Sequence, residues 1–188
     1  MFQRTINLQR LAAPLIVAGC ILAALAVRSP GQQNQAPCFH KELGDIEFLI
    51  GDWTVEANVR LGDDKWEPSS AASRISPDLS GCLLNERFTG TRAGHAFSAI
   101  AMMGFNSTTG RLQRMWSDSE HGLLIIYEGK RNGNEMILET EVQLDGRKVK
   151  LRNSYLAITR NSFRLESGRS VDDGKTWITV TKLEYTRK

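Results

Sequence analysis

The sequence predicts an all-β fold: an antiparallel up-and-down barrel of about nine to ten strands, with a short N-terminal helix plugging one end. Apolar and polar residues alternate through most of the chain after residue 51, which is the period of strands with one buried face. Asn, Asp and Gly separate these runs at short intervals, so consecutive runs are expected to pair as hairpins. No connection is long enough to hold a crossover helix, which excludes a parallel sheet.

A helix is predicted first, over residues 38–50. Phe39, Leu43, Ile46 and Ile50 lie at helical spacing, with charged residues between them. The pattern then changes to a period of two, and a first strand runs from Trp53 to the turn at residues 62–64. The further strands are expected at residues 82–89, 96–105, 112–118, 123–130, 136–144, 148–159, 162–171 and 177–187, and the sequence allows a tenth at 71–76.

The hairpin connections predict that the sheet closes on itself or packs on a second sheet, because exposed strand edges invite association. Asp145-Gly146 and Asn132-Gly133 supply the positive-φ residues that tight hairpins need. In a closed barrel the first and last strands are neighbours. Arg187 would then lie over the indole of Trp53 and donate to backbone carbonyls, as a structural clasp.

Residues 170–177, Ser-Val-Asp-Asp-Gly-Lys-Thr-Trp, satisfy the S-x-D-x-G-x-T-W pattern called an Asp-box in sialidases and related propellers. The pattern indicates a hairpin in which Asp172 accepts backbone amides, Gly174 is left-handed and Trp177 covers the turn. A sialidase needs repeated blades and an arginine triad, whereas this chain is short and has one box. We therefore interpret these residues as structural.

The first 26 residues have the features of an export signal. Arg4 and Arg10 precede residues 11–27, which carry no charge, and Ala24-Leu25-Ala26 offers small residues for cleavage. Cleavage after Ala26 leaves a linker at 27–37, rich in Ser, Pro, Gly and Gln, and a barrel domain at 38–188. The expected location is the periplasm or the extracellular medium.

Two alternatives to cleavage would attach the protein to a membrane. Residues 17–20, Val-Ala-Gly-Cys, match a bacterial lipobox, which would make Cys20 a lipidated anchor, although the apolar run continues beyond it. A retained apolar anchor would be slightly short for a membrane span and contains Pro14. A membrane partner is expected only in these two cases.

Charge gives no reason to expect a nucleic-acid partner. The formal net charge is +3, and loss of Arg4 and Arg10 with the signal leaves the mature chain nearly neutral. The one basic cluster alternates with apolar residues, as the solvated face of a strand does. Its members are Arg147, Lys148, Lys150 and Arg152.

Two cysteines remain after removal of a signal that contains Cys20. Cys38 and Cys82 form an even pair in an oxidising compartment, which favours a disulfide. Its long loop would contribute roughly 4 kcal/mol in the chain-entropy estimate. The alternative is two unpaired buried thiols.

A ligand cavity is predicted around one strand face. Arg114 and Trp116 share that face, and if it points inward they would line a cavity for a small apolar or weakly acidic molecule. Alternatively, the aromatic residues fill the core and Arg114 projects to solvent, because filled interiors are common in small barrels. The other candidates for the cavity are Trp53, His121, Tyr127, Tyr155 and Arg164.

Known catalytic and metal-binding motifs are absent: G-x-S-x-G, H-E-x-x-H, cysteine–histidine metal spacing and glycine-rich phosphate loops do not occur. We therefore expect no cofactor and no metal, and a small-ligand-binding barrel is the first hypothesis. The second is an enzyme that uses Glu86, Asp118 or His121 as acid or base, with Arg114 as an anion partner. The third is a structural or interaction module at the cell surface, which an apolar patch on the outer wall would favour.

Several short motifs occur in an order that resembles a known family. They are Phe-Leu-Ile-Gly-Asp-Trp at 48–53, Gly-Cys-Leu-Leu-Asn-Glu at 81–86, Gly-Phe-Asn at 104–106, Trp-Ser-Asp at 116–118, the Asp-box and the Tyr-Thr-Arg ending at 185–187. Over residues 38–187 the chain resembles exported bacterial proteins grouped only as a domain of unknown function, with a lipocalin-like (calycin) barrel. The resemblance implies a barrel with an internal pocket and a paired set of two cysteines, and it implies no reaction.

The nitrobindin-like haem barrels share the opening Gly-x-Trp motif with this chain. They use a histidine late in the chain as the axial ligand, whereas no histidine follows His121 here. The aromatic residue usual before the opening glycine is also replaced, by Ile50. The haem role is therefore not transferred to this protein.

Overall fold

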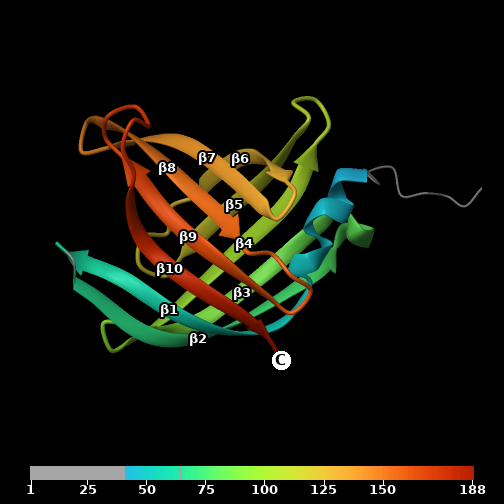
Figure 1. Cartoon of the computed structure of the whole chain (residues 1–188), viewed down its shortest axis with the longest axis horizontal. Coiled ribbons are helices and arrows are strands. Elements are labelled where there is room, and N and C mark those ends of the chain that lie inside the picture. Colours follow the sequence, from blue (N-terminus) through green and yellow to red (C-terminus); the bar gives the residue numbers. More distant parts are fainter. Residues whose placement is uncertain (1–40, 64) are drawn as a thin grey trace, which may run out of the picture. The chain divides into compact units, whose positions relative to one another are not determined.

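Ten antiparallel strands form a closed barrel in the computed structural model, which describes residues 41–63 and 65–188 (Figure 1). Each strand pairs with its neighbours in the chain, and β1 closes the barrel against β10. The predicted fold class is therefore confirmed. The strands are β1 (Gly51–Gly62), β2 (Lys65–Asp78), β3 (Leu83–Arg92), β4 (His95–Asn106), β5 (Arg111–Asp118), β6 (Ile125–Asn132), β7 (Glu135–Leu144), β8 (Arg147–Leu156), β9 (Ser162–Ser170) and β10 (Ile178–Arg187).

The strand that the sequence indicated least clearly is one of the longest. β2 spans 14 residues and pairs with β1 from Gly51↔Ile75 to Gly62↔Lys65, although alternation suggested at most residues 71–76. Its central residues are small, Ser or Ala, so the strand has little apolar signal. Two of them, Ser69 and Ala71, face a cavity instead of packed side chains. The alternation of apolar and polar residues therefore did not reveal the full length of β2, because the barrel interior beside it is hollow.

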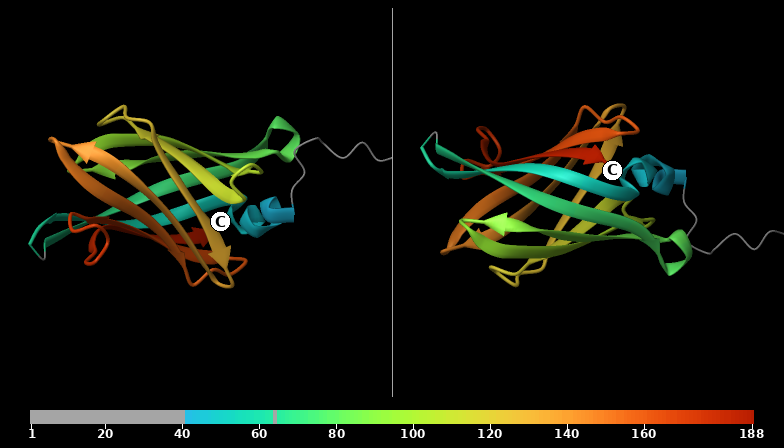
Figure 2. Two further views of the ribbon diagram at one scale, coloured as in Figure 1. Left: turned by 90° about the horizontal axis from the view of Figure 1, so that it is seen from above. Right: turned by 90° about the horizontal axis from the view of Figure 1, so that it is seen from below.

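The N-terminal helix is a 3-10 helix, η1 (Lys41–Leu49), which lies at one end of the barrel (Figure 2). Leu43, Ile46 and Leu49 recur every three residues, which is the period of a 3-10 helix. Ile46 and Leu49 are buried, and the carbonyl of Leu49 accepts the indole Nε1–H of Trp53 at 2.8 Å. The helix thus covers the end at which β1 begins, here called the closed end. A second short 3-10 helix, η2 (Leu79–Gly81), joins β2 to β3.

An arginine at the end of the last strand ties the closed end together. The guanidinium of Arg187 lies 4.2 Å from the centre of the Trp53 ring. Its Nη1 and Nη2 donate to the carbonyls of Ile50 and Phe48 at 2.6 and 3.2 Å, and its Nε donates to the carbonyl of Arg160 at 2.9 Å. The contact inferred from the sequence is present, and it joins η1, β1 and β10.

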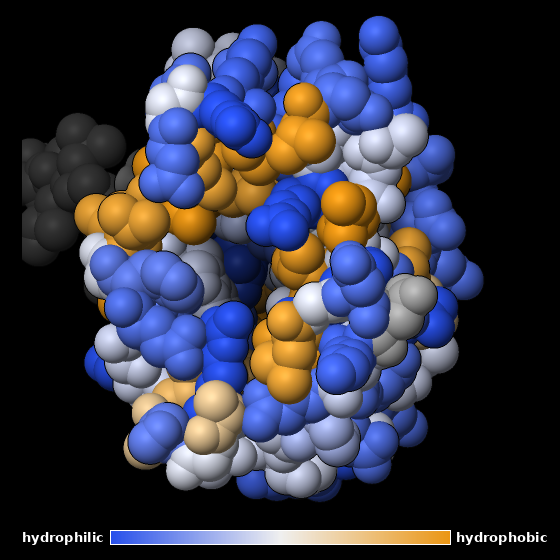
Figure 3. All heavy atoms as spheres, turned by 90° about the vertical axis from the view of Figure 1, so that its left-hand side faces the viewer, coloured by the Kyte–Doolittle hydropathy of each residue, from blue (hydrophilic) through white to orange (hydrophobic). Residues whose placement is uncertain are grey.

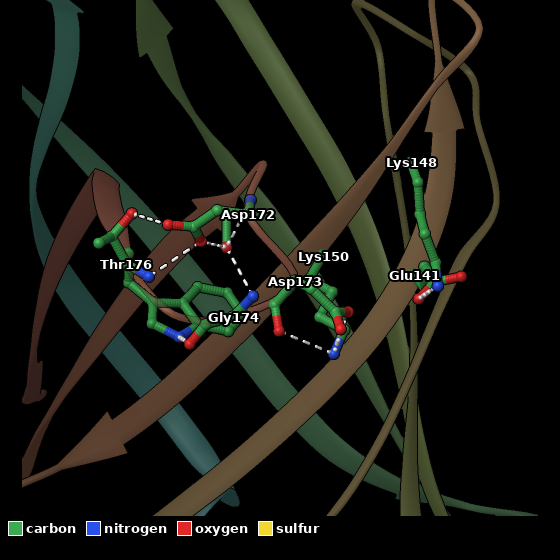
Figure 4. Close-up of polar contacts among 9 residues, drawn as sticks. Glu141, Lys148, Lys150, Asp172, Asp173, Gly174 and Thr176 are labelled. Atoms are coloured by element: carbon green, nitrogen blue, oxygen red, sulfur yellow. Dashed lines mark hydrogen bonds and ion pairs between the residues drawn. The ribbon is translucent and has the colours of Figure 1, made fainter.

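The Asp-box forms the connection between β9 and β10 (Figure 4). Asp172 accepts hydrogen bonds from the Thr176 amide at 2.9 Å, the Thr176 hydroxyl at 2.6 Å and the Ser170 hydroxyl at 2.7 Å. Gly174 has a φ of 89°, and Trp177 donates its indole N–H to the Gly174 carbonyl. All of these hydrogen bonds join residues within the loop, in agreement with the structural interpretation of the Asp-box.

Acid should loosen this loop in a predictable direction. The Thr176 hydroxyl and amide and the Ser170 hydroxyl hold the pKa of Asp172 well below its usual value. A lowered native pKa adds stability above the unfolded-state pKa of about 3.9, and that stability is lost as pH falls through the native pKa. The difference in unfolding free energy between the parent and Asp172→Asn should be constant from neutral pH to about pH 5 and shrink below about pH 4. Denaturant titrations across that range test this, and a difference that persists unchanged in strong acid would contradict it.

The basic cluster on β8 lies on the outer wall and forms ion pairs with its neighbours. Lys148 pairs with Glu141 at 2.9 Å and Lys150 with Asp173 at 2.8 Å (Figure 4). Arg152 pairs with Glu139 and lies over the ring of Trp177. The cluster is therefore a solvated strand face.

Several predictions concern residues outside the described part of the chain. The signal segment, the linker and Cys38 all lie there, so the Cys38–Cys82 disulfide stays a prediction. Among the described residues, no helix has the length and apolar character needed to cross a membrane.

Candidate functional site: a cavity at the open end of the barrel

The barrel contains a cavity of about 260 Å³ at the end opposite η1, here called the open end. Figure 3 looks onto this end and shows a hollow surrounded by a rim of mixed hydrophobic and hydrophilic residues. The lining comes from most strands of the barrel, and aromatic and aliphatic side chains make up much of it. The lining residues used below are Ser69, Phe88, Arg92, Phe97, Arg114, Trp116, Asp118, Tyr127, Asn153, Leu165 and Ser167.

An ion pair buried in the barrel interior forms the floor of the cavity. Arg114 and Glu86 are 3% and 7% exposed, and Nη2 of Arg114 lies 3.2 Å from Oε2 of Glu86. Oε1 of Glu86 accepts hydrogen bonds from the hydroxyls of Ser73 at 2.8 Å and Tyr185 at 3.3 Å. A buried charge is tolerated only with such partners, and here they come from β2, β3, β5 and β10.

Electrostatics keep Arg114 protonated in this floor, opposite the carboxylate of Glu86. Burial by itself lowers the pKa of Arg114, but Tyr155 and Glu86 outweigh it and hold that pKa above its usual value. Burial raises the pKa of Tyr155 and Tyr185, so both phenols stay neutral at physiological pH. Arg114 and Glu86 also border a void of about 10 Å³ beneath the cavity, which has room for about one water molecule.

Aromatic side chains build one wall. The guanidinium of Arg114 lies 4.7 Å from the centre of the Trp116 ring, and Phe88 contacts Trp116 edge to face at 6.3 Å. Phe97 continues the wall, with its ring 6.1 Å from that of Phe88. Nε1 of Trp116 donates to Asp118 at 3.1 Å, which fixes the indole against the cavity.

Asp118 lies where the cavity wall meets the loop between β5 and β6. Burial tends to raise its pKa, but the backbone N–H of His121, the indole of Trp116 and further hydrogen bonds lower it below the usual value. The imidazole Nδ1 of His121 lies 3.0 Å from the same carboxylate. Next to it, Arg92 pairs with Glu120 at 2.9 Å. The acid and the imidazole therefore belong to the rim.

The structure brings only some of the sequence-predicted cavity residues together. Arg114, Trp116 and Tyr127 line the cavity, whereas Tyr155 borders the small void below it. Arg114 thus points inward and not to solvent, and both expectations for the interior hold in part: the closed half is filled and the open half is hollow. The remaining three predicted residues lie elsewhere, as follows.

Trp53 is fully buried in the closed-end core, with Phe163 and Tyr185 around it. His121 is more than half exposed in the loop after β5. Arg164 lies on the outer wall, 3.4 Å from Glu166 and 3.8 Å from Glu184. It points outward because its apolar chain neighbours on β9 occupy the inner positions.

Sequence reasoning missed Phe88, Phe97 and the polar pair of Asn153 and Ser167. The Ser167 hydroxyl donates to Asn153 Oδ1 at 2.8 Å, and both residues line the cavity together with Tyr127. A signal was present for Asn153, because it occupies an inner position between the apolar residues Leu151 and Tyr155. A polar residue at such a position indicates a satisfied buried group or a ligand contact.

The groups proposed for catalysis do not form one constellation. Glu86 is engaged by Arg114, Ser73 and Tyr185 below the cavity, and His121 lies outside it. Asp118 alone of the three candidate acids and bases lines the cavity. No group of three or more His, Cys, Asp or Glu side chains within the described residues is placed to hold a metal ion.

No curated protein matches the chain. The family described as "Protein of unknown function (DUF1579)" matches residues 40–187. Among solved structures, the S-type phycobiliprotein lyase CPES from Guillardia theta is similar with a TM-score of 0.53 and 12% identity, over 77% of this chain and 91% of that chain. A protein of unknown function from the DUF3598 family of Nostoc punctiforme is similar with a TM-score of 0.37 and 14% identity, over 76% of this chain and 48% of that chain. The likeness to the lyase concerns the fold.

Proposed function

The chain belongs to the DUF1579 family of proteins of unknown function, and on that premise we propose that it is an exported binding barrel for a small, mainly apolar molecule with a weakly acidic group. The observation that carries the proposal is a buried arginine at the floor of a cavity whose lining combines aromatic and aliphatic side chains with polar ones. Phycobiliprotein lyase CPES has a similar barrel, so a binding role is compatible with the fold.

The size and lining of the cavity support a small ligand. A volume of about 260 Å³ lies just below the range of about 300–1,000 Å³ that is usual for drug-sized ligands. Phe88, Phe97 and Trp116 offer apolar and aromatic surface to the body of such a molecule. Polar groups placed among apolar and aromatic side chains are the usual means by which a small-molecule site orients its ligand.

Arg114 supports an acidic group on the ligand. Its guanidinium engages Glu86 through Nη2 and stacks on Trp116, which fixes its orientation before any ligand arrives. A planar guanidinium held in this way can accept a carboxylate or a phenolate through its other N–H donors. Because Glu86 already balances most of its charge, a weak acid suits the site better than a strongly charged anion.

A cavity-filling variant with a matched control tests the binding site. Octanoate should quench or shift the fluorescence of Trp116, and native mass spectrometry should detect the complex. Ser69→Phe places a ring in the cavity and should weaken octanoate binding by about tenfold or more, equivalent to about 1.4 kcal/mol. Ser70→Phe makes the same change at the adjacent, exposed position and should leave binding unchanged. Equal affinity in Ser69→Phe and the parent, with both folded, would refute the site.

Export is tested separately, on the full-length chain expressed in a bacterium. Intact mass and N-terminal sequencing of the processed protein should place the new terminus at Val27. A first residue of diacylated Cys20 would show that the chain is lipidated there and not cleaved after Ala26. An unprocessed chain in the cytoplasm would contradict export.

A further inference from the structure

The outer wall formed by β4, β5 and β6 carries an apolar row. Met102, Met115 and Ile126 are direct cross-strand partners, so they form one line across three strands. Ile126 is 54% exposed and Met102 is 37% exposed, and Ile100 lies beside them on β4 at 39%. Single exposed apolar residues are ordinary, but a contiguous group on a strand face indicates an interaction surface. Figure 1 shows these three strands side by side.

Charges of opposite sign flank this row on its two sides. On β3, the exposed Arg87 lies directly opposite Ile100 of β4 on one side and Arg74 of β2 on the other. On β6, Glu128 lies directly opposite Gln113 of β5 on one side and Glu139 of β7 on the other. Like charges directly opposite each other are unfavourable in a sheet. Within the part of the chain that the structure describes, neither Arg87 nor Glu128 has an ion-pair partner.

The two flanking charges are placed symmetrically about the row. Arg87 lies one strand beyond Met102 and two residues toward the open end, because it pairs with Ile100. Glu128 lies one strand beyond Met115 and two residues toward the closed end, because it pairs with Gln113. Equal and opposite displacements from the midpoint of Met102 and Met115 make the surface complementary to itself.

We propose that this wall is the interface of a homodimer. Two copies face each other about a two-fold axis that lies in the interface plane, over the midpoint of Met102 and Met115. The axis runs perpendicular to the line from Arg87 to Glu128. Arg87 of each copy then meets the partner's Glu128, and the two apolar rows cross over Met102 and Met115, as an isologous contact centred on the axis requires. The strands of the two walls cross steeply, which is one of the two usual ways for sheets to pack.

A second copy fits this surface better than a membrane does. An anionic lipid surface attracts basic residues, but it would repel Glu128, which lies beside the row. The cavity opens at the end of the barrel, whereas the row lies on its side, so a dimer leaves the mouth free. Dimerisation and ligand binding are therefore independent, and either can fail without the other.

Charge reversal with mixing gives a sharp test. Sedimentation equilibrium of the purified protein should show a concentration-dependent monomer–dimer equilibrium. Arg87→Glu and Glu128→Arg should each weaken the dimer by about tenfold or more, since each creates two like-charge contacts. An equimolar mixture of the two variants should restore association, because every contact in the mixed dimer again joins opposite charges. Arg169→Glu, an exposed reversal on β9, should leave the equilibrium unchanged.

Other outcomes would overturn the proposal. A parent that stays monomeric at millimolar concentration excludes this dimer, and so does a monomer that binds anionic lipid vesicles through this wall. Dimers that resist Ile126→Lys, with circular dichroism showing intact folding, place the interface elsewhere. Failure of the mixture to recover association refutes the Arg87–Glu128 contact and with it the two-fold arrangement.

Discussion

Arg114→Met should destabilise the barrel by about 3–5 kcal/mol, because it leaves the carboxylate of Glu86 buried without its cation. Glu86 is 7% exposed and would keep only the hydroxyls of Ser73 and Tyr185 as partners. Adding Glu86→Gln to the same chain removes the orphaned charge and should recover more than half of the loss. Urea titrations of the parent, the single variant and the double variant measure these free energies of unfolding.

A surface arginine provides the control for this experiment. Arg164→Met removes a guanidinium of the same size from the outer wall, where its partners Glu166 and Glu184 lie at 3.4 and 3.8 Å. Exposed ion pairs contribute about 0–1 kcal/mol, so the control should differ little from the parent. A single variant as stable as the parent, or a double variant no better than the single one, would show that the pair is not the buried unit inferred from its geometry.

The same double variant separates the two roles of Arg114. If the arginine binds the acidic end of a ligand, the folded double variant should bind octanoate about tenfold more weakly than the parent. Binding of 1-octanol, which has the same chain without the acid, should change little. Equal losses for both probes would assign Arg114 to the shape of the cavity and not to recognition of an acid.

Strand number and order follow from the sequence because neighbouring strands pair and their turns are chemically marked. Alternation is clear in β1 and β7, where inner positions hold packed apolar residues. It fades in β2, whose inner residues Ser69 and Ala71 face empty space. Hollow interiors remove the packing that produces the alternating signal, so the strand beside a cavity is the one that sequence patterns miss.

The candidate site was harder to predict than the fold, for a reason that the Arg114 case illustrates. Strand parity places Arg114 and Trp116 on one face but leaves open which way that face points. The residue that decides it is Glu86, which lies 28 positions earlier in the chain and two strands away in the barrel. Arg164 differs, because Phe163 and Leu165 beside it already indicate that it points outward. Long-range polar pairing is thus the information that a single sequence lacks.

Trp53→Ala should cost about 3–5 kcal/mol of unfolding free energy, the usual range for removing a fully buried large aromatic side chain. Trp53 has no exposed surface, contacts Phe163 edge to face at 4.9 Å and donates to the Leu49 carbonyl of η1. Trp66→Ala, on β2, removes a half-buried indole that packs under Lys182 and should cost well under half as much. Thermal and urea unfolding of both variants compare the two tryptophans directly.

The clasp itself is measured by a double-mutant cycle between Trp53→Ala and Arg187→Met. Arg187 contacts both the Trp53 ring and the carbonyls of Phe48 and Ile50, so removing either side chain loosens the other. The two costs should therefore be non-additive by at least about 0.5 kcal/mol, as expected for residues in contact. Additive costs would mean that the ring and the guanidinium stabilise β1 and β10 separately. The barrel would then be closed by the β1–β10 ladder alone, with η1 held at its end only by its own buried residues.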